Sequence, residues 1–203
     1  KLRGTSLEDI YEMVHIALTS EDVTNIALMS LTQQALREDY SPPFLEVLER
    51  LANMASDYKD TAMLGRTHGR AAQPTTFGKE MGVFANRVAD WAKKIYDVKL
   101  EGKLSGAIGN YTDHYAAFPS IDWISFAKKF VTDFGLVPNT STTQILPYDE
   151  AIDLFGNIES VNNVLIGLAE DMWHYVSDDW LLLKRGGISS VMAHGLISLA
   201  VKG

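Results

Sequence analysis

The chain has 203 residues and a net charge of −8, and 46% of its residues are hydrophobic. It contains no cysteine, which excludes disulfides and thiolate metal sites and suits a reducing cytosol. No basic cluster interrupts the acidic balance, and no apolar run approaches the roughly 20 residues of a membrane span. We therefore expect neither nucleic acid nor a membrane as a partner. A small anionic substrate would need local cations or helix N-termini to bind.

Signals for helix starts mark the first part of the chain. We expect a first helix to end at His15 and a second to begin at Ser20-Glu21-Asp22, where a hydroxyl and two acids favour a helix N-terminus. Ser41-Pro42-Pro43 predicts another start, because proline is well tolerated in the first helical turn. A shorter helix is expected over residues 123–134, after Ser120-Ile121-Asp122.

Three apolar seams with steps of three and four residues indicate helices that pack along their lengths. They are Phe44, Leu48, Leu51, Ala55 and Tyr58; then Met81, Phe84, Val88, Trp91, Ile95 and Val98; and finally Leu154, Ile158, Val161, Leu165, Leu168, Met172 and Tyr175. The last seam predicts one helix over residues 149–183. Strand-like alternation is nearly absent, so the sequence predicts an all-α long-helix bundle that forms a single domain over residues 1–203.

Three loops between these helices are rich in Gly, Thr, Asn or Gln, and we expect them to do more than connect helices. They cover residues 66–76, 105–114 and 138–147. The first contains Arg66-Thr67-His68-Gly69, whose imidazole could donate or accept a proton near neutral pH. Taken alone, however, a single histidine in a polar loop is more often a solvated side chain than a catalytic one.

Other polar segments are also open to two interpretations. Thr19 and Ser20, which follow His15, either cap helices or bind a phosphate or carboxylate with their hydroxyls and free N–H groups. Residues 106–111 and 142–144 are either turns or places where the backbone approaches a ligand. No pair among the five histidines has the helical spacing of a zinc site, and neither a phosphate-binding glycine loop nor a nucleophile elbow is present.

In combination, four stretches resemble the adenylosuccinate lyases of the fumarase/aspartase superfamily. They are residues 14–22, 65–81, 102–111 and 142–149. Gly106-Ala107-Ile108-Gly109-Asn110-Tyr111 together with Thr142-Thr143-Gln144-Ile145 resembles the purine lyase rather than fumarase or argininosuccinate lyase. The resemblance covers about residues 12–183, which implies the central helical region of such an enzyme, with its N-terminal and C-terminal domains largely absent.

This resemblance implies a β-elimination in purine biosynthesis. Adenylosuccinate would give AMP and fumarate, and a succinyl-carboxamide ribotide would give its carboxamide and fumarate. A dianionic intermediate makes fixed hydrogen-bond donors important. The resemblance implies His68 as the general acid and six residues that bind the substrate: His15, Thr19, Ser20, Thr67, Asn110 and Gln144.

The base in this family is a serine on a loop, and the resemblance places it at Ser189 in Ile188-Ser189-Ser190-Val191-Met192. The proline, lysine and asparagine of that loop are missing here. Residues 193–203 also fit a helix further along the family's sequence, and in that case Ser189 has no role. Arg70 replaces the glutamine common in relatives, and either adds positive charge near the substrate or faces water.

The resemblance also implies no cofactor, no metal, a cytoplasmic location and a homotetramer with shared active sites. Two alternatives stay open at this point. One is another superfamily lyase or a cycloisomerase, and the other is a non-catalytic helical fragment, which the altered serine loop favours.

Overall fold

The computed structural model describes residues 3–185 and 197–201. The chain divides into two compact units, the first made of Lys1–Phe44 and Ile95–Gly156 and the second of Leu45–Lys94 and Asn157–Gly203. Helices dominate the described residues and the strands are short, so the all-α prediction is confirmed. The single-domain assignment stays a prediction. Among the described residues, no helix combines the length and the apolar composition needed to cross a membrane.

Helical segments make up most of the described residues. They are η1 (Glu8–His15, a 3₁₀-helix), α1 (Ser20–Ala35), η2 (Leu36–Tyr40, a π-helix), α2 (Ser41–Asp57), α3 (Phe77–Asp97), α4 (Thr112–Ala117), α5 (Trp123–Asp133) and α6 (Asp149–Ser177). The strands form three two-stranded sheets: antiparallel β1 (Ala62–Thr67) and β2 (Arg70–Thr76), parallel β3 (Glu101–Gly102) and β4 (Val137–Pro138), and antiparallel β5 (Leu181–Arg185) and β6 (Ile197–Val201).

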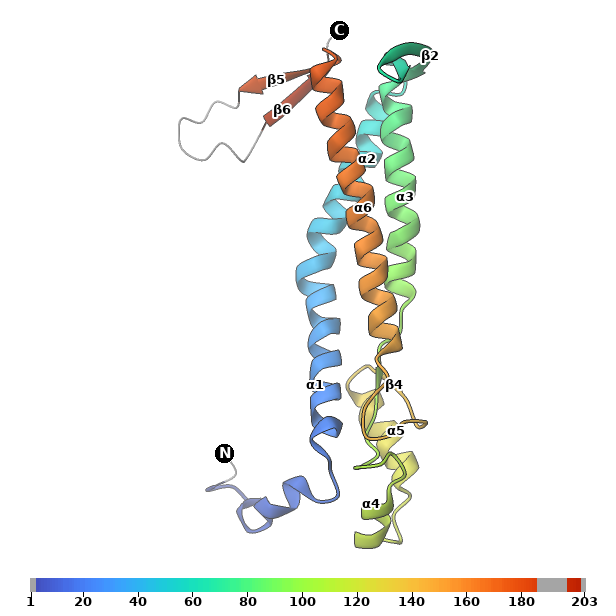
Figure 1. Ribbon diagram of the computed structural model, residues 1–203. Helices are drawn as coiled ribbons and strands as arrows, with labels where there is room; N and C mark the ends of the chain where they lie inside the picture. The colour runs from blue at the N-terminus through green and yellow to red at the C-terminus, as the bar shows by residue number, and fades with distance from the viewer. Residues whose placement is uncertain (1–2, 186–196, 202–203) are drawn as a thin grey trace. The chain divides into compact units, whose positions relative to one another are not determined.

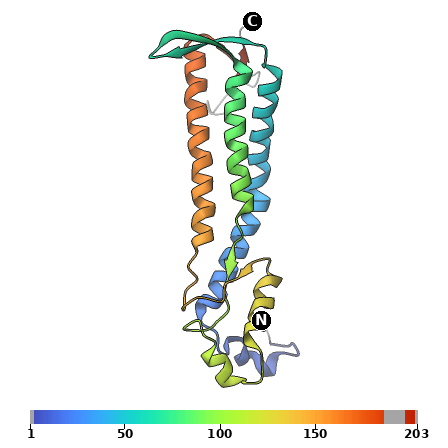
Figure 2. The same cartoon turned by 90° about the vertical axis from the view of Figure 1, so that its right-hand side faces the viewer.

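Unit 2 is built from parts of α2, α3 and α6 that run side by side (Figure 1, Figure 2). The apolar seams predicted from the sequence supply its core, with Leu51, Met81, Val88 and Val161 all buried. Gly78 lets α3 begin directly against the end of α2, because a side-chain carbon there would overlap the backbone of Ala55 and Lys59. The prediction of long helices packed along their seams is therefore confirmed in this unit.

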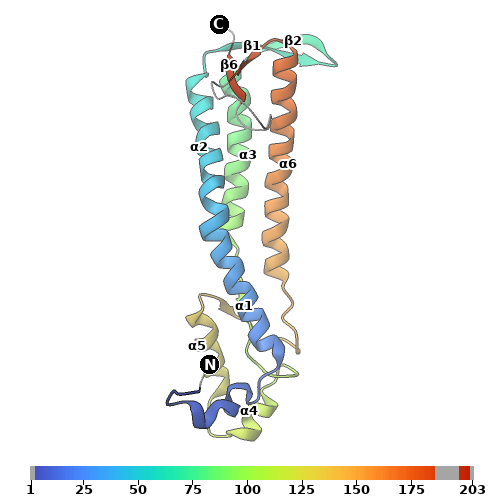
Figure 3. The ribbon, with the colours of Figure 1, turned by 90° about the vertical axis from the view of Figure 1, so that its left-hand side faces the viewer.

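In unit 1, α1 and α5 lie side by side (Figure 3), and Ile26 and Val131 are buried in the core of the unit. The predicted helix start at Ser41 needs a correction. Ser41 has helical φ and ψ of −63° and −43°, and the π-helical turn η2 carries the chain from α1 into α2 without a break. Pro42 and Pro43 offer no N–H to the preceding turn, and the Ser41 hydroxyl instead donates to the carbonyl of Leu36 at 2.6 Å.

The last long helix ends earlier than its apolar pattern predicted, at Ser177 rather than at residue 183. Asp179 adopts a left-handed φ of 62°, its N–H donates to the carbonyl of Val176, and the N–H of Trp180 donates to the carbonyl of Tyr175 at 2.8 Å. These are the hydrogen bonds of a helix C-terminal stop, which usually requires glycine. Because aspartate fills that position here, the sequence carried no obvious stop signal.

Gly109 provides a test of how closely the loops of unit 1 pack. Its φ is 77°, and a side-chain carbon would overlap the carbonyl oxygen of Thr142. We expect Gly109→Ala to lower the free energy of unfolding by about 2–4 kcal/mol, because it combines backbone strain with a steric clash. Urea unfolding followed by circular dichroism measures this change.

The matched control is Gly156→Ala, since Gly156 is helical and has open space around it. It should leave stability within about 1 kcal/mol of the original and in the stabilising direction. Equal stabilities of the two variants would contradict this packing of residues 109 and 142.

Candidate active site

A buried ion pair lies at the start of α1 in unit 1. The Lys103 ammonium is 3.1 Å from Oδ1 of Asp22, and the two side chains are 0% and 1% exposed. Burying two charges costs several kcal/mol per ion unless their hydrogen-bonding capacity is filled. We call this contact the Asp22–Lys103 pair, and its further hydrogen bonds show how that cost is offset.

Asp22 accepts three backbone hydrogen bonds besides the contact with Lys103. Its carboxylate accepts from the N–H groups of Thr19 and Ser105 at 3.0 Å each and from that of Gly106 at 3.1 Å. The bond from Thr19 closes the first turn of α1, and the other two hold the segment that follows β3. A carboxylate thus connects a helix start to a loop that is 83 residues away in sequence.

Lys103 extends the same network to a third segment. Its ammonium donates to the carbonyls of Gly106 at 3.1 Å, Thr143 at 3.4 Å and Gln144 at 2.7 Å. Its own peptide is held by the buried Asn25 amide, which accepts from the Lys103 N–H at 2.9 Å and donates to the Lys103 carbonyl at 3.0 Å. The pair therefore fixes α1, the 103–106 segment and the 142–144 segment relative to one another.

Two of the predicted substrate-binding residues, Thr19 and Gln144, are in contact next to this network. The Gln144 side-chain amide donates to the Thr19 hydroxyl at 3.1 Å, and Ser20 is the exposed first residue of α1. Beside them, the Tyr148 hydroxyl donates to the Glu21 carboxylate at 2.8 Å, and burial and this bond raise the pKa of Tyr148 to about 12. Hydroxyls, an amide and a helix N-terminus together form a surface that can bind an anion.

His15 and Asn110 lie in the same unit and are both exposed. His15 is the last residue of η1, and its carbonyl accepts from the N–H of Leu18. The Asn110 side chain accepts from the N–H and hydroxyl of Thr112, at 3.1 and 2.6 Å, at the start of α4. A local structural role is thus visible for Asn110, while its predicted contact with substrate stays a prediction.

His68 and Thr67 lie in unit 2, in an element that the sequence did not suggest. Residues 66–76 were expected to be a loop, but β1 and β2 form a hairpin that turns at His68-Gly69, where both residues have positive φ, of 52° and 72°. The favoured two-residue hairpin turns require such angles, usually from Asn-Gly or Asp-Gly, and His-Gly was not recognised as this signal. The turn exposes the imidazole, and the Thr67 hydroxyl lies 3.1 Å from its Nδ1.

The hairpin is joined to the end of α6 within the same unit. The Arg66 guanidinium lies 2.9 Å from the Asp178 carboxylate and also donates to the carbonyl of Gly69 at 3.2 Å. A cavity of about 500 Å³ opens beside this contact, and Glu80 and Asp171 are among the residues that line it. Burial, and secondarily the charge of Glu80, raise the pKa of Asp171.

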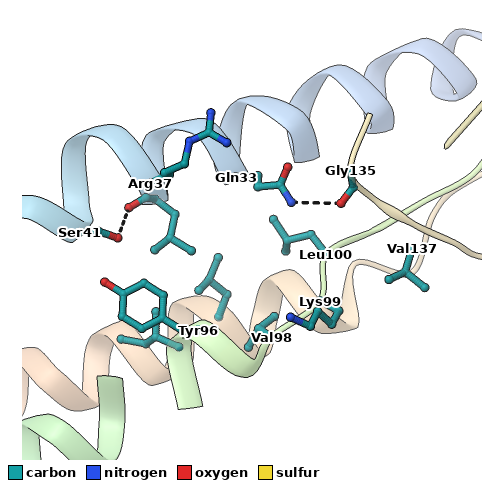
Figure 4. Close-up of a pocket in the computed structure, with 12 residues that line it drawn as sticks. Gln33, Arg37, Ser41, Tyr96, Val98, Lys99, Leu100, Gly135 and Val137 are labelled. Atoms are coloured by element: carbon teal, nitrogen blue, oxygen red, sulfur yellow. Dashed lines mark hydrogen bonds between the residues drawn. The ribbon is translucent and has the colours of Figure 1, made fainter. Parts of the chain in front are cut away.

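The remaining predicted residues are placed as follows. Arg70 is exposed and pairs with Thr67 in the hairpin, whereas Ser189 lies outside the described residues. A further cavity of about 320 Å³ in unit 1, beside the Gln33–Gly135 hydrogen bond, contains none of the predicted site residues (Figure 4). Within residues 3–185 and 197–201, no three His, Asp or Glu side chains gather as a metal site would require.

Sequence reasoning missed the residues that support the site, chiefly Asp22, Asn25 and Lys103. Lys103 carries no clear local signal, because Lys99 and Glu101 lie close to it in sequence and it looks like one charge among several. A charge in such a setting is either solvated or paired in the core. Its partner, Asp22, had been interpreted only as an acid that favours a helix start.

Removing one partner of the Asp22–Lys103 pair should be costly. We expect Lys103→Met to lower the free energy of unfolding by about 3–5 kcal/mol, because it leaves a buried carboxylate without its cation. The control is Lys129→Met, which breaks the exposed pair between Lys129 and Asp133 and should cost less than about 1 kcal/mol. Denaturant unfolding compares the two variants, and a cost for Lys103→Met as small as that of the control would refute the role of the pair.

Comparisons with known proteins agree on the family. The profile of a family described as lyase matches residues 3–185. The chain is 37% identical to the adenylosuccinate lyase of Escherichia coli K12 over 171 residues, which are 84% of this chain and 38% of that enzyme. It is 36% identical to the adenylosuccinate lyase of Buchnera aphidicola subsp. Schizaphis graminum over 195 residues, which are 95% of this chain and 43% of that enzyme.

The solved structure of a fumarate lyase from Mesorhizobium sp. BNC1 shares the fold, with a TM-score of 0.71 at 23% identity, over 83% of this chain and 40% of the other. The chain thus spans about two fifths of the length of these proteins. The matched family profile covers most of the sequence, and the shared fold is of the fumarase/aspartase type. This chain belongs to the lyase family.

Proposed function

We propose that this chain is the central part of an adenylosuccinate lyase, which releases fumarate from adenylosuccinate and from succinyl-carboxamide ribotide in purine biosynthesis. The relatives named adenylosuccinate lyase support the activity. The observation that carries the proposal is the Thr19–Gln144 hydrogen bond at the N-terminus of α1, above the Asp22–Lys103 pair.

This arrangement suits one carboxylate of a succinyl group. The positive end of the dipole at the start of α1 favours an anion, and the Thr19, Ser20 and Gln144 side chains offer hydrogen bonds. Such local attraction is needed because the chain carries a net charge of −8. The buried pair fixes these groups in advance, so that little reorganisation is required when charge develops in the substrate.

The chemistry we propose is a β-elimination. A base removes the proton from the carbon next to a carboxylate, the carbon–nitrogen bond breaks, a carbon–carbon double bond forms, and an acid protonates the departing nitrogen. We assign the acid to His68, whose ring is exposed at the hairpin turn beside the Thr67 hydroxyl. We assign the base to Ser189 and further substrate contacts to His15, Thr67 and Asn110. No cofactor is required.

We also propose that the enzyme is a cytoplasmic homotetramer with active sites shared between subunits. Large apolar side chains on α6 support this assembly. Ile152, Ile166 and Trp173 are 65%, 57% and 74% exposed and recur at multiples of seven residues, which places them along one face of the helix. A partner helix would cover such a face.

The role of His68 gives the direct test of the proposed function. In the full-length protein, adenylosuccinate should be converted to AMP and fumarate, and argininosuccinate should not be cleaved. We expect His68→Gln to lower turnover by about 10²–10⁴-fold, the usual contribution of a general acid. Loss of substrate absorbance measures turnover, and circular dichroism verifies that the variant is folded.

The control is Lys129→Gln, which changes an exposed side chain of α5 that pairs with Asp133 and should leave turnover near the original value. Near-normal turnover of His68→Gln would remove His68 from the mechanism. Absence of turnover in the unaltered full-length protein would refute the proposed activity itself.

A further inference from the structure

His114 in α4 is a buried titratable group that the proposed chemistry does not use. His114 is 1% exposed, and neither nitrogen of its ring has a hydrogen-bond partner in the part of the chain that the structure describes. A neutral imidazole carries one donor and one acceptor, and leaving both unsatisfied costs free energy. A buried group without partners therefore calls for an explanation.

Aromatic rings hold the imidazole on two sides. The ring of Trp123 lies 4.9 Å away, centroid to centroid, and that of Tyr111 lies 5.8 Å away, with interplanar angles of 62° and 65°. These are edge-to-face contacts, which fix the orientation of a planar ring. The imidazole is therefore held in place by packing rather than by hydrogen bonds.

The imidazole also packs against Gly106, whose backbone forms hydrogen bonds with both Asp22 and Lys103. A side-chain carbon at Gly106 would lie 3.3 Å from Cε1 of His114 and 3.4 Å from the carbonyl oxygen of Ala17, so the turn fits closely between them. The Gly106 N–H donates to Asp22 at 3.1 Å, and its carbonyl accepts from Lys103 at 3.1 Å. His114 thus supports a peptide that contacts both members of the Asp22–Lys103 pair.

The charges around the ring make its protonation state important. Asp22 from α1, Lys103 from the segment after β3 and Asp113 from α4 itself act on it, whereas α5 presents the neutral Trp123. Burial is the largest effect and lowers the pKa of His114, with Lys103 acting in the same direction and the two acids opposing it. The ring is accordingly neutral at neutral pH. Tyr111 beside it also stays neutral, since burial raises its pKa.

We propose that His114 is a positioning residue of the candidate site, whose neutral ring fixes the Gly106 turn against the Asp22–Lys103 pair and whose protonation in acid loosens that turn. An imidazolium has two donors and no acceptor, so it competes with Lys103 and the backbone N–H groups for the Asp22 carboxylate. The effect of this protonation on substrate binding rests on the proposed function, because Asp22 holds Thr19 and Lys103 holds Gln144.

The direction of the pH effect follows from the lowered pKa. The folded state favours the neutral ring, so this contribution to stability is fully present above the ordinary histidine value of about 6.5. It is lost as the pH falls from there toward the lower pKa of the folded state. The loss should therefore occur on the acid side of neutrality.

The test uses the full-length protein and His114→Phe, which keeps a buried ring but cannot titrate. Tryptophan fluorescence should decrease with a midpoint below pH 6.5 as the protonated ring quenches Trp123, and both His114→Phe and Trp123→Phe should abolish that step. Hydrogen exchange of residues 103–106, corrected for its intrinsic pH dependence, should increase with the same midpoint and stay flat in His114→Phe. If His114→Phe does not fold, His114→Leu replaces it, and His174→Phe is the control for an exposed histidine.

Substrate kinetics add a readout that a purely structural residue would not change. We expect KM to rise by about tenfold per pH unit below the midpoint, and this step should be absent in His114→Phe. The proposal would be overturned if hydrogen exchange of residues 103–106 did not change when His114 is protonated. It would also be overturned if the pH-dependent step persisted in His114→Phe. An enzyme without turnover would instead refute the proposed function, and fluorescence and exchange would still decide the role of His114.

Discussion

The contact between Asp22 and Lys103 is the constraint on which the arrangement of unit 1 depends. Two charges with side chains that are almost wholly inaccessible to water would destabilise the fold if they were not surrounded by hydrogen bonds. Here the carboxylate accepts from three backbone N–H groups and the ammonium donates to three carbonyls. The pair is thereby satisfied by segments that are far apart in sequence, and those segments are in turn fixed. The pair thereby holds the start of α1 and the 103–106 and 142–144 segments in one arrangement.

The helical framework could be predicted because its signals are local. The apolar seams of α3 and α6 repeat every three or four residues, and Met81, Val88 and Val161 are buried as expected. The start of α1 at Ser20 and the capping of α5 by Asp122 also follow from short polar patterns. The errors occurred where an unusual residue performs a common task. A left-handed aspartate ends α6, and His68-Gly69 forms a hairpin turn for which asparagine or aspartate is the expected first residue.

The candidate site was predictable only in part, for a related physical reason. Thr19 and Gln144 were selected because the segments around them resemble a known family, and the structure brings these two side chains into contact. Lys103 lies in one of the matched stretches, but its importance comes from contacts with residues about 80 positions away, as in the bond between Asn25 and Lys103, and His114 lies outside the four stretches. Spacing along a helix or strand cannot reveal these partners. The roles of His68, His15 and Asn110 in chemistry stay predictions, and Ser189 lies outside the described residues.

Gln144, whose carbonyl is held by Lys103 of the buried pair, is the residue proposed to bind a carboxylate of the substrate. The most direct measurement is the dissociation constant for adenylosuccinate in the full-length protein that carries His68→Gln, so that turnover does not disturb the equilibrium. Adding Gln144→Ala should weaken binding by about 10–100-fold, the contribution of a hydrogen bond to a charged group. Adding Gln34→Ala, which changes an exposed amide bonded to Glu38, should leave binding unchanged. Equal dissociation constants for the two double variants would show that Gln144 does not bind the substrate.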